Sequence, residues 1–288
     1  MAGTKDDATG DSRAWSSALT TDEFAAIRSV GFEPVGQVLG AAVYLIGNTG
    51  GFNCPGPFEE GMLSSDRTIT EVSGDGRAGT FGPFVRALNK ARRAAITRMS
   101  DECTRLGGHG VAAVRLTVGE SAVTGGMEVT AIGTAVRAPG AARLRQPFTS
   151  DLSGQDFTKL ICAGWVPVGL VFGISAGVRH DDLLTRGQTW WSAGNAEVSG
   201  YTELVNAVRH DARRQLQANV ERLGAEGVVT QDMSLRLRQR GCPVREAGRD
   251  HVAEATITGT AIARYSRAAR QQRSMSLAVL SLGTAHGG

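Results

Sequence analysis

The sequence has little of what marks a disulfide scaffold, a membrane protein or a nucleic-acid binder. Its four cysteines, Cys54, Cys103, Cys162 and Cys242, lie far apart and form no Cys-x-x-Cys pair, which predicts reduced thiols in a cytoplasmic protein. Nowhere do about 18 apolar residues run without a charge, so neither a transmembrane helix nor a membrane partner is expected. A formal net charge of only +3, with 6% aromatic residues, does not favour a nucleic-acid partner.

Familiar catalytic motifs are also missing. The chain contains no P-loop and no His-Glu-x-x-His helix, which removes the usual signals for those nucleotide and zinc sites. The stretch from Gly74 to Gly79 does fit Gly-x-Gly-x-x-Gly, after a short β-like stretch from Thr68 to Val72. The second half of the chain lacks this motif, so a glycine-rich loop is preferred over a dinucleotide site.

The composition is that of a globular protein with about two domains. The 288 residues are 41% hydrophobic and 20% charged, which is enough for two domains of roughly 100 to 200 residues each. The 38 glycines imply many turns and close backbone contacts. Residues 1–22 are polar and rich in Ala, Ser, Thr and Gly, and we expect them to form a flexible tail.

The two halves of the chain repeat one another. Gly31 to Gly40 reads GFEPVGQVLG and Gly164 to Gly173 reads GWVPVGLVFG, at an offset of 133. Leu106 to Val111 matches Leu223 to Val228 at an offset of 117, and a Gly-Thr-Ala triplet recurs at an offset of 126. These blocks predict a tandem duplication, with 16 extra residues before the helix of copy one and 9 near the last hairpin of copy two.

Each copy contains one strong helix signal. Apolar residues recur at three- and four-residue spacing, which places them along one face of a helix. They are Phe84, Leu88, Ala91, Ala95, Met99, Cys103 and Leu106 in copy one, and Tyr201, Val205, Val208, Ala212, Leu216, Val220 and Leu223 in copy two. We expect both stripes to face the core, and Gly107 and Gly224 to end the helices in the left-handed conformation.

The remaining patterns predict an α+β fold of two tandem β-α-β-β modules. After each helix the apolar period changes to two, which indicates two strands joined by a turn. Each helix then packs on a small, mainly antiparallel sheet. The expected bounds are repeat one at residues 23–137, a linker at 138–150, repeat two at 151–265 and a flexible C-terminal tail at 266–288. One helix covers only one sheet face and leaves strand edges unpaired, so further association is expected.

Three blocks resemble the YbjQ-like family: the Val-x-Gly segment, the Ala- and Arg-rich helix ending in Leu-Gly-x-x-Gly-Val, and the terminal Gly-Thr-Ala strand. The resemblance covers Phe24 to Arg137 and Phe157 to Tyr265. It implies a dodecin-like subunit of sheet and helix that assembles as a homo-oligomer, a pentameric ring. The family's heavy-metal-binding label implies a metal ion as ligand. The long loop of copy one, residues 47–80, departs from the compact family pattern.

Candidate metal ligands are scattered along the chain. Cys103 lies on the apolar helix stripe and is expected to be a core thiol, whereas Cys54 and Cys242 lie in variable loops. Two His-Asp neighbour pairs are expected in solvated loops or turns, His180-Asp181 and Asp250-His251. No Cys or His is repeated between the copies, so the residues by themselves assign no metal site.

Arginines are grouped late in the chain. Arg236, Arg238 and Arg240 alternate with Leu235 and Leu237, which on a strand places the cations on one face and the leucines in the core. A solvated face is the preferred interpretation, for these and for the helix arginines, because the chain also holds 28 acidic residues. It lacks the interleaved exposed aromatics that stack on bases.

The C-terminal tail carries a short apolar segment, Ser276 to Gly283, after a polar, basic spacer. Such a segment can fold into a groove on a partner. It resembles the C-terminal targeting peptides of encapsulin cargo proteins, with Leu280 in place of their usual glycine. We expect Leu277, Val279 and Leu282 to be the partner-binding residues. Docking on the chain's own assembly, docking on a protein shell and plain disorder all stay open.

The sequence as a whole favours a non-catalytic, self-assembling ring or scaffold protein built from two YbjQ-like modules. Any metal or small ligand is expected at subunit interfaces. No catalytic or cofactor-binding residue is assigned. Two alternatives remain: an enzyme whose site lies between modules or subunits, and an encapsulin-type cargo or partner-docking protein that uses its C-terminal apolar segment.

Overall fold

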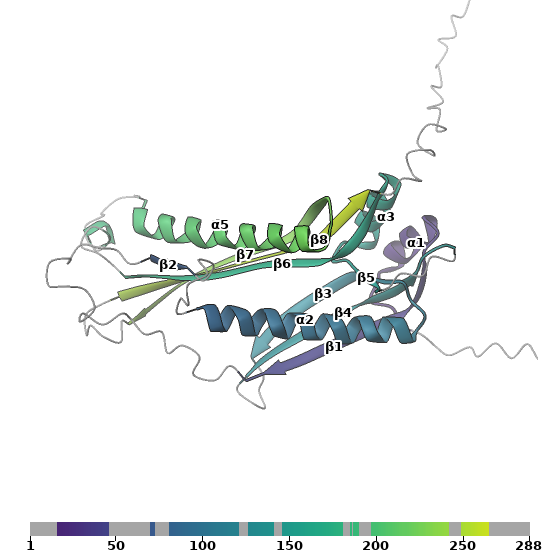
Figure 1. The fold of residues 1–288 in the computed structure, drawn as a ribbon, viewed down its shortest axis with the longest axis horizontal. Helices are drawn as coiled ribbons and strands as arrows, with labels where there is room; N and C mark the ends of the chain where they lie inside the picture. The colour runs from purple at the N-terminus through teal and green to yellow at the C-terminus, as the bar shows by residue number, and fades with distance from the viewer. Residues whose placement is uncertain are drawn as a thin grey trace, which may run out of the picture.

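The described part of the chain is stacked in four layers, α5, sheet two, α2 and sheet one (Figure 1). A computed structural model gives this structure. It describes residues 16–45, 70–72, 81–120, 126–140, 146–180, 185, 187–189, 197–241 and 249–264. The α+β fold class is confirmed, since each of two tandem modules has one long helix on a mainly antiparallel sheet. No helix in these ranges is both long and apolar enough to cross a membrane.

Module one and module two have the same order of elements. Module one comprises α1 (Thr21–Ser29), β1 (Glu33–Tyr44), α2 (Gly82–Arg105), β3 (Gly110–Glu120) and β4 (Met127–Arg137). Module two comprises α3 (Gly154–Cys162), β6 (Trp165–His180), α5 (Ser199–Arg222), β7 (Gly227–Gly241) and β8 (Arg249–Arg264). The expected β-α-β-β order is therefore present in both, preceded each time by a short helix that we did not predict.

The two short helices have ordinary start signals. The side chain of Thr20 accepts a hydrogen bond from the Glu23 amide, and the Glu23 carboxylate accepts one from the Thr20 amide, which completes a capping box. At the same place in module two, the Ser153 side chain accepts from the Asp156 amide. These caps satisfy amide groups that the first helical turn leaves without partners.

Each sheet has a fourth strand from outside its β-β-β set. Sheet one has the order β1-β4-β3-β5, where β5 (Phe148–Thr149) lies in the segment expected to be a linker and runs parallel to β3. Sheet two has the order β2-β6-β8-β7, where β2 (Thr70–Val72) comes from the long loop of copy one and pairs with β6. Each sheet is therefore completed by a short strand from a segment outside its own β-β-β set, and these two strands connect the modules. The motif from Gly74 to Gly79 lies outside the described residues.

The helix stripes face the core, as predicted, except at their C-terminal ends. Ala91, Ala95, Met99 and Cys103 are fully buried. Leu106 and Leu223, which end the stripes, are 42% and 45% exposed, so their assignment to the core was wrong. Each is the C-cap residue, where the chain leaves the helix axis. The following glycines adopt the expected positive φ, 70° at Gly107 and 64° at Gly224.

Helix α2 is buried on two sides. Its inner side packs on sheet one through Val38, Ala42 and Val129, and its other side packs under the β6 residues Phe172 and Ile174 of module two. By contrast, α5 packs on the opposite face of sheet two, with Val171, Ala255 and Ile257, and forms the outermost layer in Figure 1. The largest core cluster thus spans both modules.

Two expectations about module two were wrong. Leu235 and Leu237 of β7 are 41% and 42% exposed instead of lying in the core. They belong to β7, the edge strand of sheet two, whereas the buried residues that pack against α5 come from β6 and β8. Asp250 and His251 were expected in a solvated loop, but they lie in β8 and are 0% and 5% exposed. The His251 ring packs 4.0 Å from the ring of Tyr201, which gives it a place under α5.

We predict that Gly40→Ala destabilises module one. A Cβ at Gly40 would overlap the carbonyl oxygen of Ala95 on α2, so the helix must move off the strand. The expected loss is about 1–3 kcal/mol or more in the free energy of unfolding, measured by urea denaturation. Gly119→Ala is the matched control, because a Cβ there meets nothing within 4 Å, and it should change stability by about 0.5 kcal/mol or less. Equal effects of the two substitutions would contradict the close packing of α2 on β1.

Candidate functional site

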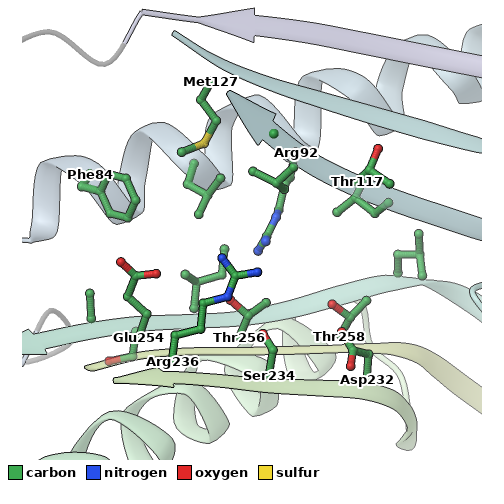
Figure 2. Close-up of a pocket in the computed structure, with 18 of the residues that line it drawn as sticks. Phe84, Arg92, Thr117, Met127, Asp232, Ser234, Arg236, Glu254, Thr256 and Thr258 are labelled. Atoms are coloured by element: carbon green, nitrogen blue, oxygen red, sulfur yellow. The ribbon is translucent and has the colours of Figure 1, made fainter. Parts of the chain in front are cut away.

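A cleft of about 960 Å³ lies between the two modules. One wall consists of α2 and β3 of module one, and the other consists of β6, β7 and β8 of module two (Figure 2). The cleft therefore exists only because both modules fold against one another.

Arg92 is the buried charge of this cleft. It extends from α2 toward the β7 and β8 wall (Figure 2), is 6% exposed, and has its guanidinium carbon 5.7 Å from the centre of the Phe172 ring. Its Nε and Nη1 atoms find no acceptor among the described residues. Burial lowers the pKa of Arg92 to about 10, so it remains a cation at neutral pH. The ring of Phe172 offers it cation–π stabilisation.

The opposite wall is polar and carries both signs of charge. Asp232, Ser234 and Arg236 come from β7, while Glu254, Thr256 and Thr258 come from β8 (Figure 2). Arg238 approaches Glu254 at 4.0 Å, but its side chain is 62% exposed. An ion pair that open to solvent adds little to stability. This wall offers hydroxyl groups and charges that a bound molecule could contact.

Asp151 lies where the cleft meets the junction between the modules. The hydroxyl of Thr260 donates to its carboxylate, and the same hydroxyl accepts from the Asp151 amide at 3.1 Å. Burial raises the pKa of Asp151, the hydrogen bond from Thr260 opposes that rise, and the nearby charge of Asp232 adds to it. Asp151 therefore takes up a proton more readily than an aspartate in water does.

The cleft can bind a molecule with an anionic group and an apolar body. Arg92 supplies the buried cation, and Phe84, Leu88 and Met127 supply an apolar wall. Among the residues that line it, the titratable groups are carboxyls and guanidiniums, with neither Cys nor His. This is the place between modules where the alternative of an enzyme would put its site.

Metal ligands do not converge within the described ranges. No group of three or more His, Cys, Asp or Glu side chains in them could hold a metal ion. Cys103 is the expected core thiol: it donates to the Gly110 carbonyl at 3.3 Å, and burial raises its pKa to about 11, which disfavours the thiolate that a soft metal needs. His109 accepts from the Ala138 amide at 3.2 Å. Cys162 is exposed, and Cys54 and Cys242 lie outside the described residues.

Sequence reasoning missed the cleft residues. Arg92 was assigned to a solvated helix face, although an arginine recurs at the counterpart position, Arg209. That recurrence was the available signal. The proposed partner-binding residues Leu277, Val279 and Leu282 lie outside the described part of the chain.

Asp151→Asn should stabilise the protein at neutral pH. Folding raises the pKa of Asp151. The contribution of this carboxyl to stability is therefore complete at a pH below its pKa in the unfolded chain, and it is lost as the pH rises through its pKa in the folded protein. The increase in the free energy of unfolding that Asp151→Asn gives over the wild type should therefore be smallest in acid. It should reach a plateau at a pH above the pKa of Asp151 in the folded protein. Urea denaturation of both proteins from pH 4 to pH 8 measures it.

Asp156→Asn is the control of opposite sign. The hydroxyl of Ser153 and the ammonium of Lys159 lower the pKa of Asp156, so its contribution is present at neutral pH and is lost as pH falls through the folded pKa. Asp156→Asn should therefore lower the free energy of unfolding at pH 7 and leave it unchanged in acid. A pH-independent effect of Asp151→Asn would contradict the assigned proton affinity.

Known proteins place this chain in a family. A family model described as "Putative heavy-metal-binding", that of the YbjQ proteins, matches residues 66–139, which contain β2, α2, β3 and β4. The described residues do not assemble the ligand set that this description suggests. The chain is also 33% identical, over 224 residues, to the "Encapsulin nanocompartment protein Rv1762c" of Mycobacterium tuberculosis (strain ATCC 25618 / H37Rv), with 75% of this chain and 76% of that protein covered. The predicted family is thus confirmed: the chain belongs to the YbjQ-like family, and it is similar over most of its length to that mycobacterial protein.

Proposed function

We propose that this chain is a non-catalytic subunit that assembles with copies of itself and serves as a scaffold or cargo protein of an encapsulin nanocompartment. The relative from Mycobacterium tuberculosis carries the nanocompartment name, and it matches three quarters of this chain at 33% identity. The shared length includes more than one module, so the likeness supports a common architecture.

The observation that carries self-assembly is an exposed apolar face on sheet one. Leu39, Val43 and Leu45 are 49%, 52% and 73% exposed. Leu39 and Val43 point away from α2, since the residue before each of them, Val38 and Ala42, faces it. Burying one such side chain fully is worth about 1.5–3 kcal/mol. A row of them on one strand is typical of a protein-binding surface.

Assembly is expected to close as a ring, with the pentamer of the family as the expected form. Each chain contributes two modules, and each module keeps the sheet-and-helix pattern of a family subunit. Identical contacts that pass from chain to chain close into a ring when the rotation between neighbours allows it.

The C-terminal apolar segment supplies the link to a shell. Leu277, Val279 and Leu282 lie after a basic spacer, in an apolar segment that also contains Leu280 and the small residues Ala278 and Ser281. An extended segment of this kind binds by placing alternate side chains in pockets of its partner. Assembly and shell docking then use separate parts of the chain.

Removing the C-terminal segment should separate these two properties. Native mass spectrometry should find the full chain and a chain that ends at Ser274 in the same oligomer. When each is co-expressed with the encapsulin shell protein of its source organism, only the full chain should co-purify with closed shells. Leu277→Asp with Leu282→Asp should behave like the truncation.

Three results would count against this proposal. A full chain that is monomeric would exclude self-assembly. An oligomer that is lost on truncation would place the segment inside the assembly. Shell loading that survives truncation would exclude the segment as the docking element.

A further inference from the structure

We infer that copies of this chain join head to tail by repeating, between chains, the contact that joins module one to module two within the chain. The inference rests on the proposed self-assembly and names its interface. It commits to a second copy of this chain as the partner of the exposed apolar face, because the chain itself shows what covers the same face in module two.

Within the chain, the β6 face of module two covers α2. Phe172, Ile174, Ala176 and Val178 are 8%, 3%, 1% and 5% exposed, and all belong to the core cluster that contains α2. They alternate along β6 with residues that face α5, such as Val171. One strand of module two thus packs on both long helices.

The module-one counterparts of Phe172, Ala176 and Val178 are exposed, and Ala41, the counterpart of Ile174, is half-buried. The offset of 133 relates Phe172 to Leu39, Ala176 to Val43, and Val178 to Leu45. Each counterpart is about half exposed or more, while its partner in the repeat is buried. The two modules therefore present corresponding apolar rows, and among the described residues only the row of module two is covered.

The second part of the internal contact is a seam, by which we mean the backbone hydrogen bonds between β3 and the segment around Ser150. The Val114 amide donates to the Ser150 carbonyl at 2.8 Å, and the Ser150 amide donates to the Val111 carbonyl at 2.9 Å. Under this seam Val111 and Val114 are 0% and 4% exposed. The ring of Phe148 lies against Gly110, where a Cβ would overlap it.

The counterpart of that seam is open on β7. The offset of 117 relates Val111 to Val228 and Val114 to Gln231, which are half-buried and exposed. Gly227 corresponds to Gly110, but a Cβ on it would meet only Ile262 side-chain atoms, the nearer at 3.6 Å, among the described residues. The edge of β7 therefore has space where β3 holds an aromatic ring and a strand.

The segment that would fill this edge is already held in place on module one. Ser17 and Ala18 bond to the Thr134 hydroxyl at 3.3 and 3.0 Å, as Ser150 and Asp151 bond to that of Thr260 at 3.1 Å each. Trp15, which corresponds to Phe148 by the offset of 133, lies outside the described residues.

Each chain thus has two different surfaces, and one of them would bind the other on the next chain. The donor surface consists of Ser16–Leu19 and the apolar row Leu39, Val43 and Leu45. The acceptor surface consists of the β7 edge at residues 227–231 and the outer side of α5. On α5, Arg209 stands where Arg92 stands on α2, so it would face Leu39 of the next chain as Arg92 faces Phe172. Two unlike surfaces make a heterologous contact, which forms rings or filaments and not a two-fold dimer.

Complementary blocked variants test this interface. Leu39→Lys with Val43→Lys blocks the donor surface and opposes the arginines of α5. Gly227→Phe blocks the acceptor surface, and its Cβ would make only ordinary contact with Ile262 side-chain atoms among the described residues. Leu106→Lys is the control for the first change, because Leu106 and its counterpart Leu223 are equally exposed and lie outside the internal contact. Gly241→Phe, at the far end of β7, is the control for the second.

Native mass spectrometry and analytical ultracentrifugation should find each blocked variant monomeric and both controls assembled like the wild type. A mixture of the two blocked variants should form a 1:1 heterodimer and nothing larger, because each pair retains one usable interface. Circular dichroism melts confirm that the variants are folded.

The outcomes separate the interface from the proposed function. Blocked variants that assemble like the wild type, or that form homodimers, would overturn the head-to-tail interface and leave self-assembly standing. A mixture that stays monomeric while the wild type assembles would also overturn the interface. A monomeric wild type would overturn the proposed self-assembly itself.

Discussion

Burial of α2 on both sides is the constraint on which the rest of the structure depends. The helix needs sheet one beneath it and the Phe172 row of module two above it, so neither module reaches its observed packing alone. Apolar burial of this kind is the main favourable term in folding. It fixes how the modules stack, where the cleft opens and which faces of the chain are left uncovered.

The short segment after the first module makes that stacking specific. Its backbone pairs with β3 of module one, while its hydroxyls bond to β6 and β8 of module two: Thr149 accepts from the Leu170 amide, and Ser150 contacts Thr260. An apolar contact by itself permits sliding, whereas backbone pairing sets a register. The aromatic cluster of Phe32, Phe148 and Phe157 closes the same junction.

The cleft and the assembly surfaces follow from one geometric fact. Sheet two packs on α2 through β6 residues such as Phe172 and Ile174, and its β7 and β8 residues line a polar-walled cavity that contains Arg92. If module one of a second chain packed on α5 as module two packs on α2, a second cavity would form between the chains, with Arg209 in the place of Arg92. The heavy-metal description of the family has no counterpart among the described side chains, whereas the exposed apolar row of sheet one agrees with the assembly that we propose.

The sequence by itself determined the local features of this protein. Apolar spacing placed both long helices, a change of period placed the strands after them, and the position of Cys103 marked it as a core thiol, because each of these depends on neighbours within a few residues. The tertiary structure alone decided the rest. Asp250 and His251 are buried, Leu235 and Leu237 are exposed, Leu39 is open and its counterpart Phe172 is covered. Such differences depend on what a distant part of the chain, or another chain, lays over each face. Local patterns give the two modules identical faces, so only the stacking of one module on the other distinguishes them.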